Sequence, residues 1–184
     1  MSLRIALLRG INVGGKNVLP MKTLAEDLRD LGLDAVKTYI QSGNVVFRDG
    51  RDDRSAAALG EAIGETIETR HGFRPQVLVL TASEWTAIAK ANPYPEATDD
   101  PKTLHVFVCA TPPPAPDLER LDALRAPDER IRLDGRVLYL HAPSGIGRSK
   151  LAAKAETALG VPVTARNWRT VGKLIAMIDA IDGA

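Results

Sequence analysis

Residues 36–48 read VKTYIQSGNVVFR, and this stretch decides the fold that we predict for the chain. Val36 to Ile40 and Asn44 to Arg48 have the composition of two β-strands. Residues 41–43, QSG, join them so tightly that the two strands should form a hairpin. Ser42 and Asn44 are therefore interpreted as turn residues rather than as catalytic groups.

The elements on both sides of this hairpin complete a recognisable order. Apolar residues recur with helical spacing over Met21 to Leu31 and over Ser55 to Arg70, where Ser55 is a suitable N-cap. Residues 3–8, LRIALL, and Gln76 to Leu80 are predicted strands at the two ends. The order β-α-β-β-α-β is that of the split βαβ, or ferredoxin-like, arrangement.

The same order of elements is predicted a second time after residue 102. Its parts are a strand Leu104–Cys109, a helix Asp117–Leu124, strands Arg130–Leu133 and Val137–His141 around the turn Asp134-Gly135, a helix Ser149–Leu159 and a short strand Val163–Thr164. A short helix over Ala82 to Ala91, capped by Thr81 or Ser83, and a proline-rich loop over 92–102 connect the halves.

We therefore predict an α+β protein of two ferredoxin-like (βαββαβ) halves, with mainly antiparallel sheets and an amphipathic C-terminal helix. The apolar stripe of that helix is made by Val171, Leu174, Ile175, Ile178 and Ile181. The expected division is residues 1–81 for the first half, 82–102 for the connection, 103–165 for the second half and 166–184 for the C-terminal helix, which should pack on the core.

Composition narrows the classes of function. The 184 residues carry 24 basic and 23 acidic side chains, whereas a general polyanion binder usually has a clear basic excess. The single cysteine, Cys109, excludes an intramolecular disulfide and is interpreted as a small core residue. Without a signal-peptide pattern or a long apolar stretch, we expect a cytoplasmic protein with no membrane segment.

The loop after the first strand is the main candidate site. Residues 9–17, RGINVGGKN, come close to the phosphate-binding pattern GxxxxGK[ST], but Asn17 replaces the hydroxyl residue that would hold magnesium. Pro20 delays the following helix, and the predicted sheet is not parallel, so a nucleotide-hydrolysing loop is rejected. Two interpretations remain open, an amide-lined anion site flanked by Arg9 and Lys16, and a plain glycine-rich turn.

Two other basic clusters stand at predicted helix starts. Residues 144–150, SGIGRSK, lead directly into a helix whose first amides would suit an anion near Lys150. Arg166 and Arg169 flank the start of the last helix, where Asn167 is a natural N-cap and where acidic residues are normally preferred. A bound anion would explain these cations, and so would ion pairs elsewhere in the fold.

Five segments together resemble the uncharacterised bacterial family known as domain of unknown function 1697: RGINVGGKN, PMKTLAEDLRDLG, TYIQSGNVVF, GIGRSKL and TARNWRTVGKL. The resemblance spans Arg4 to about Met177. It implies a small cytosolic protein with a two-part α+β structure. It implies no established activity, substrate or catalytic residue.

The leading hypothesis is a protein that binds a small phosphorylated or otherwise anionic ligand. The predicted ligand-binding residues are Arg9, Asn12, Gly14, Gly15, Lys16, Lys150, Arg166 and Arg169. The three histidines, His71, His105 and His141, lack metal-ligand spacing, so no metal and no cofactor are predicted, and no catalytic residue is assigned. The alternatives are a nucleic-acid-binding module that uses the same cations and a structural or interaction protein without catalysis, as a monomer or homodimer.

Overall fold

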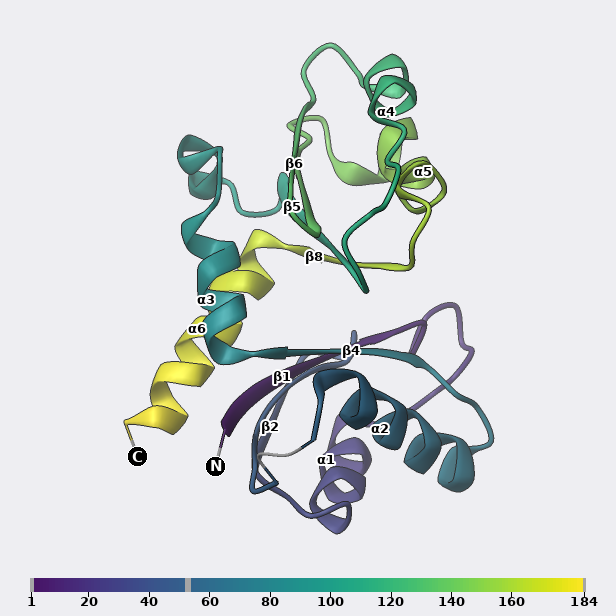
Figure 1. Ribbon diagram of the computed structural model, residues 1–184, viewed down its shortest axis with the longest axis vertical. Coiled ribbons are helices and arrows are strands. Elements are labelled where there is room, and N and C mark those ends of the chain that lie inside the picture. The colour runs from purple at the N-terminus through teal and green to yellow at the C-terminus, as the bar shows by residue number, and fades with distance from the viewer. Residues whose placement is uncertain (1, 52–53, 184) are drawn as a thin grey trace. The chain divides into compact units, whose positions relative to one another are not determined.

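The structure, a computed structural model, describes residues 2–51 and 54–183 and divides into two units (Figure 1). Unit 1 consists of Met1–Ala87 and Lys173–Ala184, and unit 2 of Ile88–Gly172. The unit boundaries fall inside helices α3 (Ala82–Lys90) and α6 (Trp168–Asp182). The four-part division predicted from the sequence stays a prediction.

Unit 1 contains one antiparallel sheet of β1 (Ser2–Arg9), β2 (Leu33–Tyr39), β3 (Asn44–Asp49) and β4 (Gln76–Thr81). The strand order is β2-β3-β1-β4, and the chain connects these strands as β-α-β-β-α-β. Helices α1 (Met21–Asp30) and α2 (Ala56–His71) cover the same face of the sheet in Figure 1. The predicted hairpin and the ferredoxin-like topology of this half are confirmed.

The core of unit 1 forms where the apolar stripes of the two helices meet the sheet. Leu24 and Leu28 of α1 and Ile63 of α2 are fully buried against Phe47 of β3. Ser55 caps α2, because its hydroxyl oxygen accepts a hydrogen bond from the Ala58 backbone N–H at 3.1 Å. Burial of these helix faces supplies most of the stability that short helices lack in water.

Unit 2 repeats the topology with β5 (Leu104–Cys109), β6 (Arg130–Asp134), β7 (Val137–His141) and β8 (Val163–Asn167) in the order β6-β7-β5-β8. Helices α4 (Leu118–Leu124) and α5 (Lys150–Leu159) lie on one side of this sheet (Figure 1). The core is built from apolar residues of β5, β7, β8 and both helices, among them Phe107, Leu121, Leu140 and Leu151. The second ferredoxin-like half is thereby confirmed.

Several element boundaries differ from the prediction. Strand β2 begins at Leu33 rather than Val36, because buried Leu33 pairs with Asp49 before a β-bulge between Asp34 and Lys37 interrupts the alternation. Strand β8 continues to Asn167 rather than ending at Thr164, since its last three residues pair with β5. The predicted loop over 92–102 contains a short 3-10 helix at Pro95–Asp99.

The caps of α3 and α6 explain where these helices begin. The Thr81 hydroxyl accepts from the Glu84 N–H at 3.1 Å, while a Glu84 carboxylate oxygen accepts from the Thr81 N–H at 2.7 Å, which is a capping box. Asn167 Oδ1 accepts from the Thr170 N–H at 3.0 Å, as predicted for that N-cap. No helix in the described residues is both long and apolar enough to cross a membrane.

Candidate functional site in the loop after strand β1

The glycine-rich loop closes on itself as a tight reverse turn. Val13 and Lys16 form an isolated antiparallel bridge, and the Lys16 N–H donates to the Val13 carbonyl at 3.1 Å. Gly14 and Gly15, between them, have φ values of 58° and 73°, as a type I′ turn requires of both central residues. Both glycines are therefore needed by the turn itself, whatever the loop binds.

Asn12 holds the base of this loop through three side-chain hydrogen bonds. Its Oδ1 accepts from the Leu19 N–H at 2.8 Å, and its Nδ2 donates to the Leu19 carbonyl at 2.9 Å. The same Nδ2 donates to the Gln41 carbonyl at 2.9 Å, so the loop is tied to the β2–β3 turn. An amide nitrogen has only two hydrogens, so the structure gives Asn12 a positioning role in the loop.

Residues 40–43 pack directly against the start of the loop. The Leu8 N–H donates to the Gly43 carbonyl at 2.8 Å, and a Cβ at position 43 would lie 2.7 Å from the Cβ of Leu8. Gly43 also has a positive φ of 76°, so position 43 needs glycine for two separate reasons. As predicted, Ser42 and Asn44 serve the turn, because Asn44 Nδ2 donates to the Ser42 hydroxyl and to the Tyr39 carbonyl, both at 3.0 Å.

A shallow pocket of about 420 Å³ lies between the loop and this turn. The residues that line it are Asn12, Gly15, Val18, Pro20 and Gln41. The lining residue Val18 is 64% exposed. Val13, within the loop, and Ile40, which directly precedes the lining residue Gln41, are 66% and 51% exposed. The lining of the pocket therefore combines polar backbone and side-chain amide groups with the exposed aliphatic side chain of Val18.

Two cations belong to the same loop. Arg9, at the end of β1, is exposed, and its Nη1 donates to Gln76 Oε1 at 3.3 Å. Lys16 directly follows the pocket residue Gly15, is exposed, and forms no ion pair with any described residue. Lys16 is thus the cation of the loop that is best placed to meet a ligand from solvent.

The other predicted cations lie in unit 2, at three different kinds of position. Lys150 is the first residue of α5, which Ser149 caps by accepting from the Ala152 N–H at 3.0 Å. Arg166 stands in β8, where burial lowers its pKa to about 10, and its Nη1 donates to the Ala165 carbonyl at 2.8 Å. Arg169 is in the first turn of α6. The loop belongs to unit 1, so joint action of all eight residues in one site stays a prediction.

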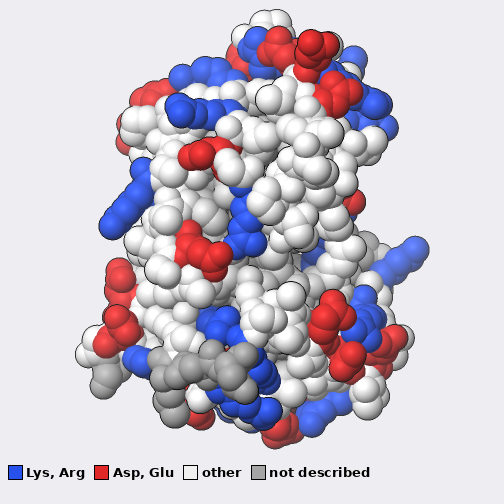
Figure 2. Space-filling view, in the orientation of Figure 1, with Lys and Arg blue, Asp and Glu red and all other residues white. Residues whose placement is uncertain are grey.

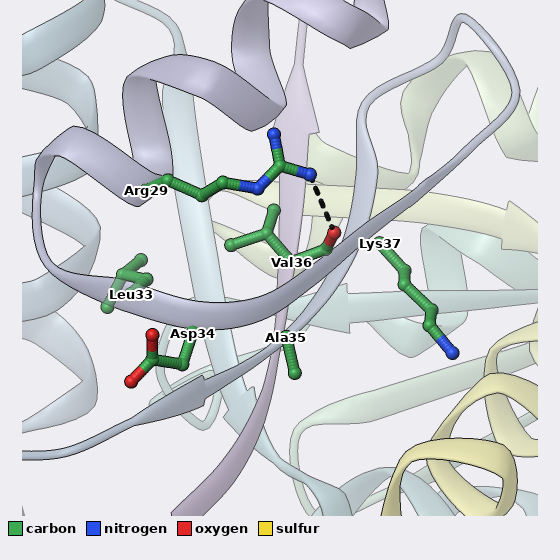
Figure 3. A pocket seen from close by; sticks show the side chains of 6 residues that line it. All are labelled: Arg29, Leu33, Asp34, Ala35, Val36 and Lys37. Atoms are coloured by element: carbon green, nitrogen blue, oxygen red, sulfur yellow. Dashed lines mark hydrogen bonds between the residues drawn. The ribbon is translucent and has the colours of Figure 1, made fainter.

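A second pocket, which we did not predict, lies at the β2 bulge in unit 1 (Figure 3). It also measures about 420 Å³, and its lining residues are Arg29, Leu33, Asp34, Ala35, Val36 and Lys37. Arg29 reaches from α1 over the bulge, and its Nη2 donates to the Val36 carbonyl at 3.4 Å. Ala35 adopts a positive φ of 50°. An alanine in the sequence does not predict this conformation, because positive φ values are uncommon for residues other than glycine.

A cluster of charged groups in unit 1 joins α1 to α2. The buried carboxylate of Asp27 accepts from Arg70 Nη1 at 2.7 Å, and its other oxygen lies 2.7 Å from His71 Nε2. Arg70 also pairs with Asp30 at 2.8 Å. These ion pairs and hydrogen bonds link the two helices, so we assign the cluster to the stability of unit 1.

A comparable cluster in unit 2 surrounds Arg130. Its guanidinium lies 4.6 Å from the centre of the Tyr94 ring and pairs with the Glu96 carboxylate. Arg130 Nη2 also donates to His141 Nδ1 at 2.9 Å, which makes the His141 ring neutral with its proton on Nε2. Burial and the neighbouring Arg130 both lower the pKa of His141. This cluster fastens the segment after α3 to the sheet.

Three further features bear on function: the potential metal ligands, the Cys109 thiol and the charges on the surface. In residues 2–51 and 54–183, no group of three or more His, Cys, Asp and Glu side chains is arranged to hold a metal ion. Burial raises the pKa of the Cys109 thiol to about 11, which disfavours the nucleophilic thiolate. On the face shown in Figure 2, groups of Lys and Arg and groups of Asp and Glu are both present, separated by uncharged surface.

The family of the chain follows from comparison with known proteins. A family model described as a protein of unknown function, DUF1697, matches residues 1–139. The chain belongs to this family. The matched stretch includes the loop and the hairpin, whereas the motifs GIGRSKL and TARNWRTVGKL of this DUF1697 protein lie beyond it.

A solved structure is similar to nearly the whole DUF1697 chain. It is that of the conserved bacterial protein SP0830 from Streptococcus pneumoniae, with 26% sequence identity and a TM-score of 0.66. The similarity covers 96% of this chain and 98% of that protein. No curated protein matches the chain significantly.

Proposed function

We propose that this DUF1697 protein binds a small phosphorylated or otherwise anionic ligand at the loop formed by residues 9–17. The observation that carries the proposal is the pocket of about 420 Å³ between this loop and the β2–β3 turn, with the exposed cation Lys16 directly after its lining residue Gly15. Pockets that hold small molecules commonly have volumes of about 300–1,000 Å³. Its place on loops at the end of a rigid sheet is typical of binding sites.

The glycines of the loop give an anion close access to the backbone. Gly14 and Gly15 are exposed, and a Cβ built on either meets no other atom within 4 Å, so neither side of the turn is obstructed. Backbone N–H groups at such a turn can donate to an anion, and Lys16 would add a charge-assisted hydrogen bond. Because the whole chain has a formal net charge of only +1, attraction for an anion must arise locally.

The proposed function is binding without nucleotide hydrolysis of the P-loop type. In a P-loop the glycine-rich segment leads into a helix whose first amides point at phosphate. Here the loop closes as a reverse turn, and Pro20 separates it from α1. The Asn17 side chain, at the position of the magnesium-binding hydroxyl, donates instead to the Gly10 carbonyl at 2.9 Å.

The proposal is tested by calorimetric titration of the protein with inorganic phosphate and with phosphate monoesters at fixed ionic strength. We expect saturable binding that Lys16→Gln weakens by about tenfold, the loss of one charge-assisted hydrogen bond. Lys154→Gln, which removes an exposed cation of α5, is the matched control and should change nothing. Absence of binding by every anion, or equal weakening by both variants, would contradict the proposal.

A further inference from the structure

We infer that the ligand of this loop is amphiphilic, with an alkyl or ring portion beside its anionic group. The inference rests on the proposed function and adds the chemical class of the ligand. It starts from the distribution of exposed apolar side chains. The large hydrophobic residues that are exposed in the described part of the chain are Val13, Val18, Ile40 and Leu118. The first three lie in the loop, directly after it and in the adjoining turn, respectively.

The three aliphatic residues stand on two chain segments that a side-chain hydrogen bond links. Asn12 links the loop to the turn through its hydrogen bond to the Gln41 carbonyl, and Ile40 directly precedes Gln41. Val18 itself lines the pocket. Isolated surface hydrophobics are ordinary, but exposed hydrophobic residues beside a pocket that also has polar groups are typical of a binding site.

The conformation of Ile40 strengthens this argument. Its φ is 47°, in the left-handed region where glycine and asparagine are favoured and where a β-branched residue is a clear outlier. The side chain is also 51% exposed, so burial within its own unit does not account for an isoleucine at this position. Such strained residues concentrate at functional sites, and contact with an apolar part of a ligand would account for an exposed isoleucine at this position.

The size and polarity of the pocket fit the same class of ligand. A volume of about 420 Å³ exceeds the needs of a bare phosphate ion and leaves space for a carbon chain or ring. Both hydrogens of Asn12 Nδ2 are already used by the backbone carbonyls of Leu19 and Gln41. The anionic group would therefore meet Lys16 and the turn amides, while Val18 and Pro20 would contact the apolar portion.

The test compares hexyl phosphate, inorganic phosphate and hexanol in titrations of the full chain at matched ionic strength. We expect hexyl phosphate to bind at least about tenfold more tightly than phosphate, because several methylene groups become buried. Val18→Ser and Ile40→Asn should remove most of this preference, measured in each variant as the ratio of its affinities for hexyl phosphate and phosphate. Ile40→Asn should keep or raise the melting temperature, because asparagine tolerates a positive φ. Leu118→Ser, which changes an exposed residue of α4, is the matched control.

The outcomes separate the two claims. If phosphate and hexyl phosphate bind equally and Lys16→Gln weakens both, the amphiphilic ligand is wrong while anion binding stands. If hexanol binds as tightly as hexyl phosphate, or if neither phosphate compound binds, the proposed function fails as well. Equal losses in Val18→Ser and Leu118→Ser would also overturn the inference, since the preference would then not come from this loop.

Discussion

Asn12 and Leu19 are joined by two hydrogen bonds, from the Leu19 N–H to Asn12 Oδ1 at 2.8 Å and from Asn12 Nδ2 to the Leu19 carbonyl at 2.9 Å. The side-chain amide thus pairs with the backbone of Leu19 as a neighbouring strand would. This pairing spans the glycine-rich turn and fixes its base before any ligand arrives. The loop is consequently preorganised, which would lower the entropic cost of binding the proposed ligand.

Replacement of Asn12 should therefore destabilise the fold. Asn12→Ala removes three hydrogen bonds and leaves backbone groups of Leu19 and Gln41 without their partner, which should cost about 1–3 kcal/mol. Asn17→Ala, which removes a single bond to the Gly10 carbonyl, is the control and should cost less. Urea unfolding measures both changes, and an Asn12→Ala protein as stable as the wild type would contradict this role.

Two glycines with nearly equal φ angles should respond differently to alanine. Gly10 and Gly43 have φ values of 75° and 76°, but only at Gly43 would a Cβ collide, at 2.7 Å from Leu8 Cβ. Gly10→Ala should cost about 1–2 kcal/mol of strain. Gly43→Ala should cost a further 1–3 kcal/mol or so from overpacking. Equal midpoints of urea denaturation for the two variants would show that the turn does not pack as described.

The stability of the protein should fall as the solution becomes acidic through the histidine range. Burial lowers the pKa of His105, and its Nδ1 is buried without a hydrogen-bond partner among the described residues. A histidine whose folded pKa is depressed contributes stability that is present above the unfolded value of about 6.5 and is lost as pH falls below it.

His105→Leu should flatten this pH dependence. The comparison is the urea midpoint at pH 7.5 and at pH 5.5 for each protein, above and below the unfolded histidine pKa of about 6.5. Part of the slope should remain in the variant, because the pKa of His141 is also lowered. An unchanged slope in His105→Leu would mean that His105 does not titrate with unfolding.

Cys109 should be inert to thiol reagents in the native protein. The side chain is fully buried, and burial raises the pKa of its thiol to about 11, so little thiolate exists at pH 8. A colorimetric disulfide reagent should react with it only after denaturation, when one thiol per chain becomes available. Rapid reaction in the native state would contradict the described burial.

Much of the fold could be predicted because local signals agree with the tertiary structure. The hairpin around residues 41–43, the apolar stripe of α1 and the caps at Ser55, Ser149 and Asn167 all depend on short-range chemistry that the sequence displays. The duplicated topology followed from the order of these elements. Each of these predictions needed only neighbouring residues.

The features that escaped prediction depend on backbone angles and on burial. Ala35 and Ile40 adopt positive φ values of 50° and 47°, although neither residue type signals such a conformation. The start of β2 could not be predicted, because the bulge beside Ala35 interrupts the alternation of the strand. The pocket in Figure 3 lies at this bulge and was not predicted for the same reason. The exposure of Ile40 could not be inferred either, since an isoleucine at the end of a predicted strand is normally expected in a core.

The most direct test of anion binding by the loop is a nuclear magnetic resonance titration of the isotope-labelled protein with hexyl phosphate. We expect the backbone amide signals of Gly14, Gly15 and Lys16 to shift first and to saturate together, and Lys16→Gln to reduce these shifts greatly. Signals from the α4 residue Leu118 should stay in place. Unchanged amide signals in the loop at saturating ligand, or shifts confined to other parts of the chain, would contradict the account.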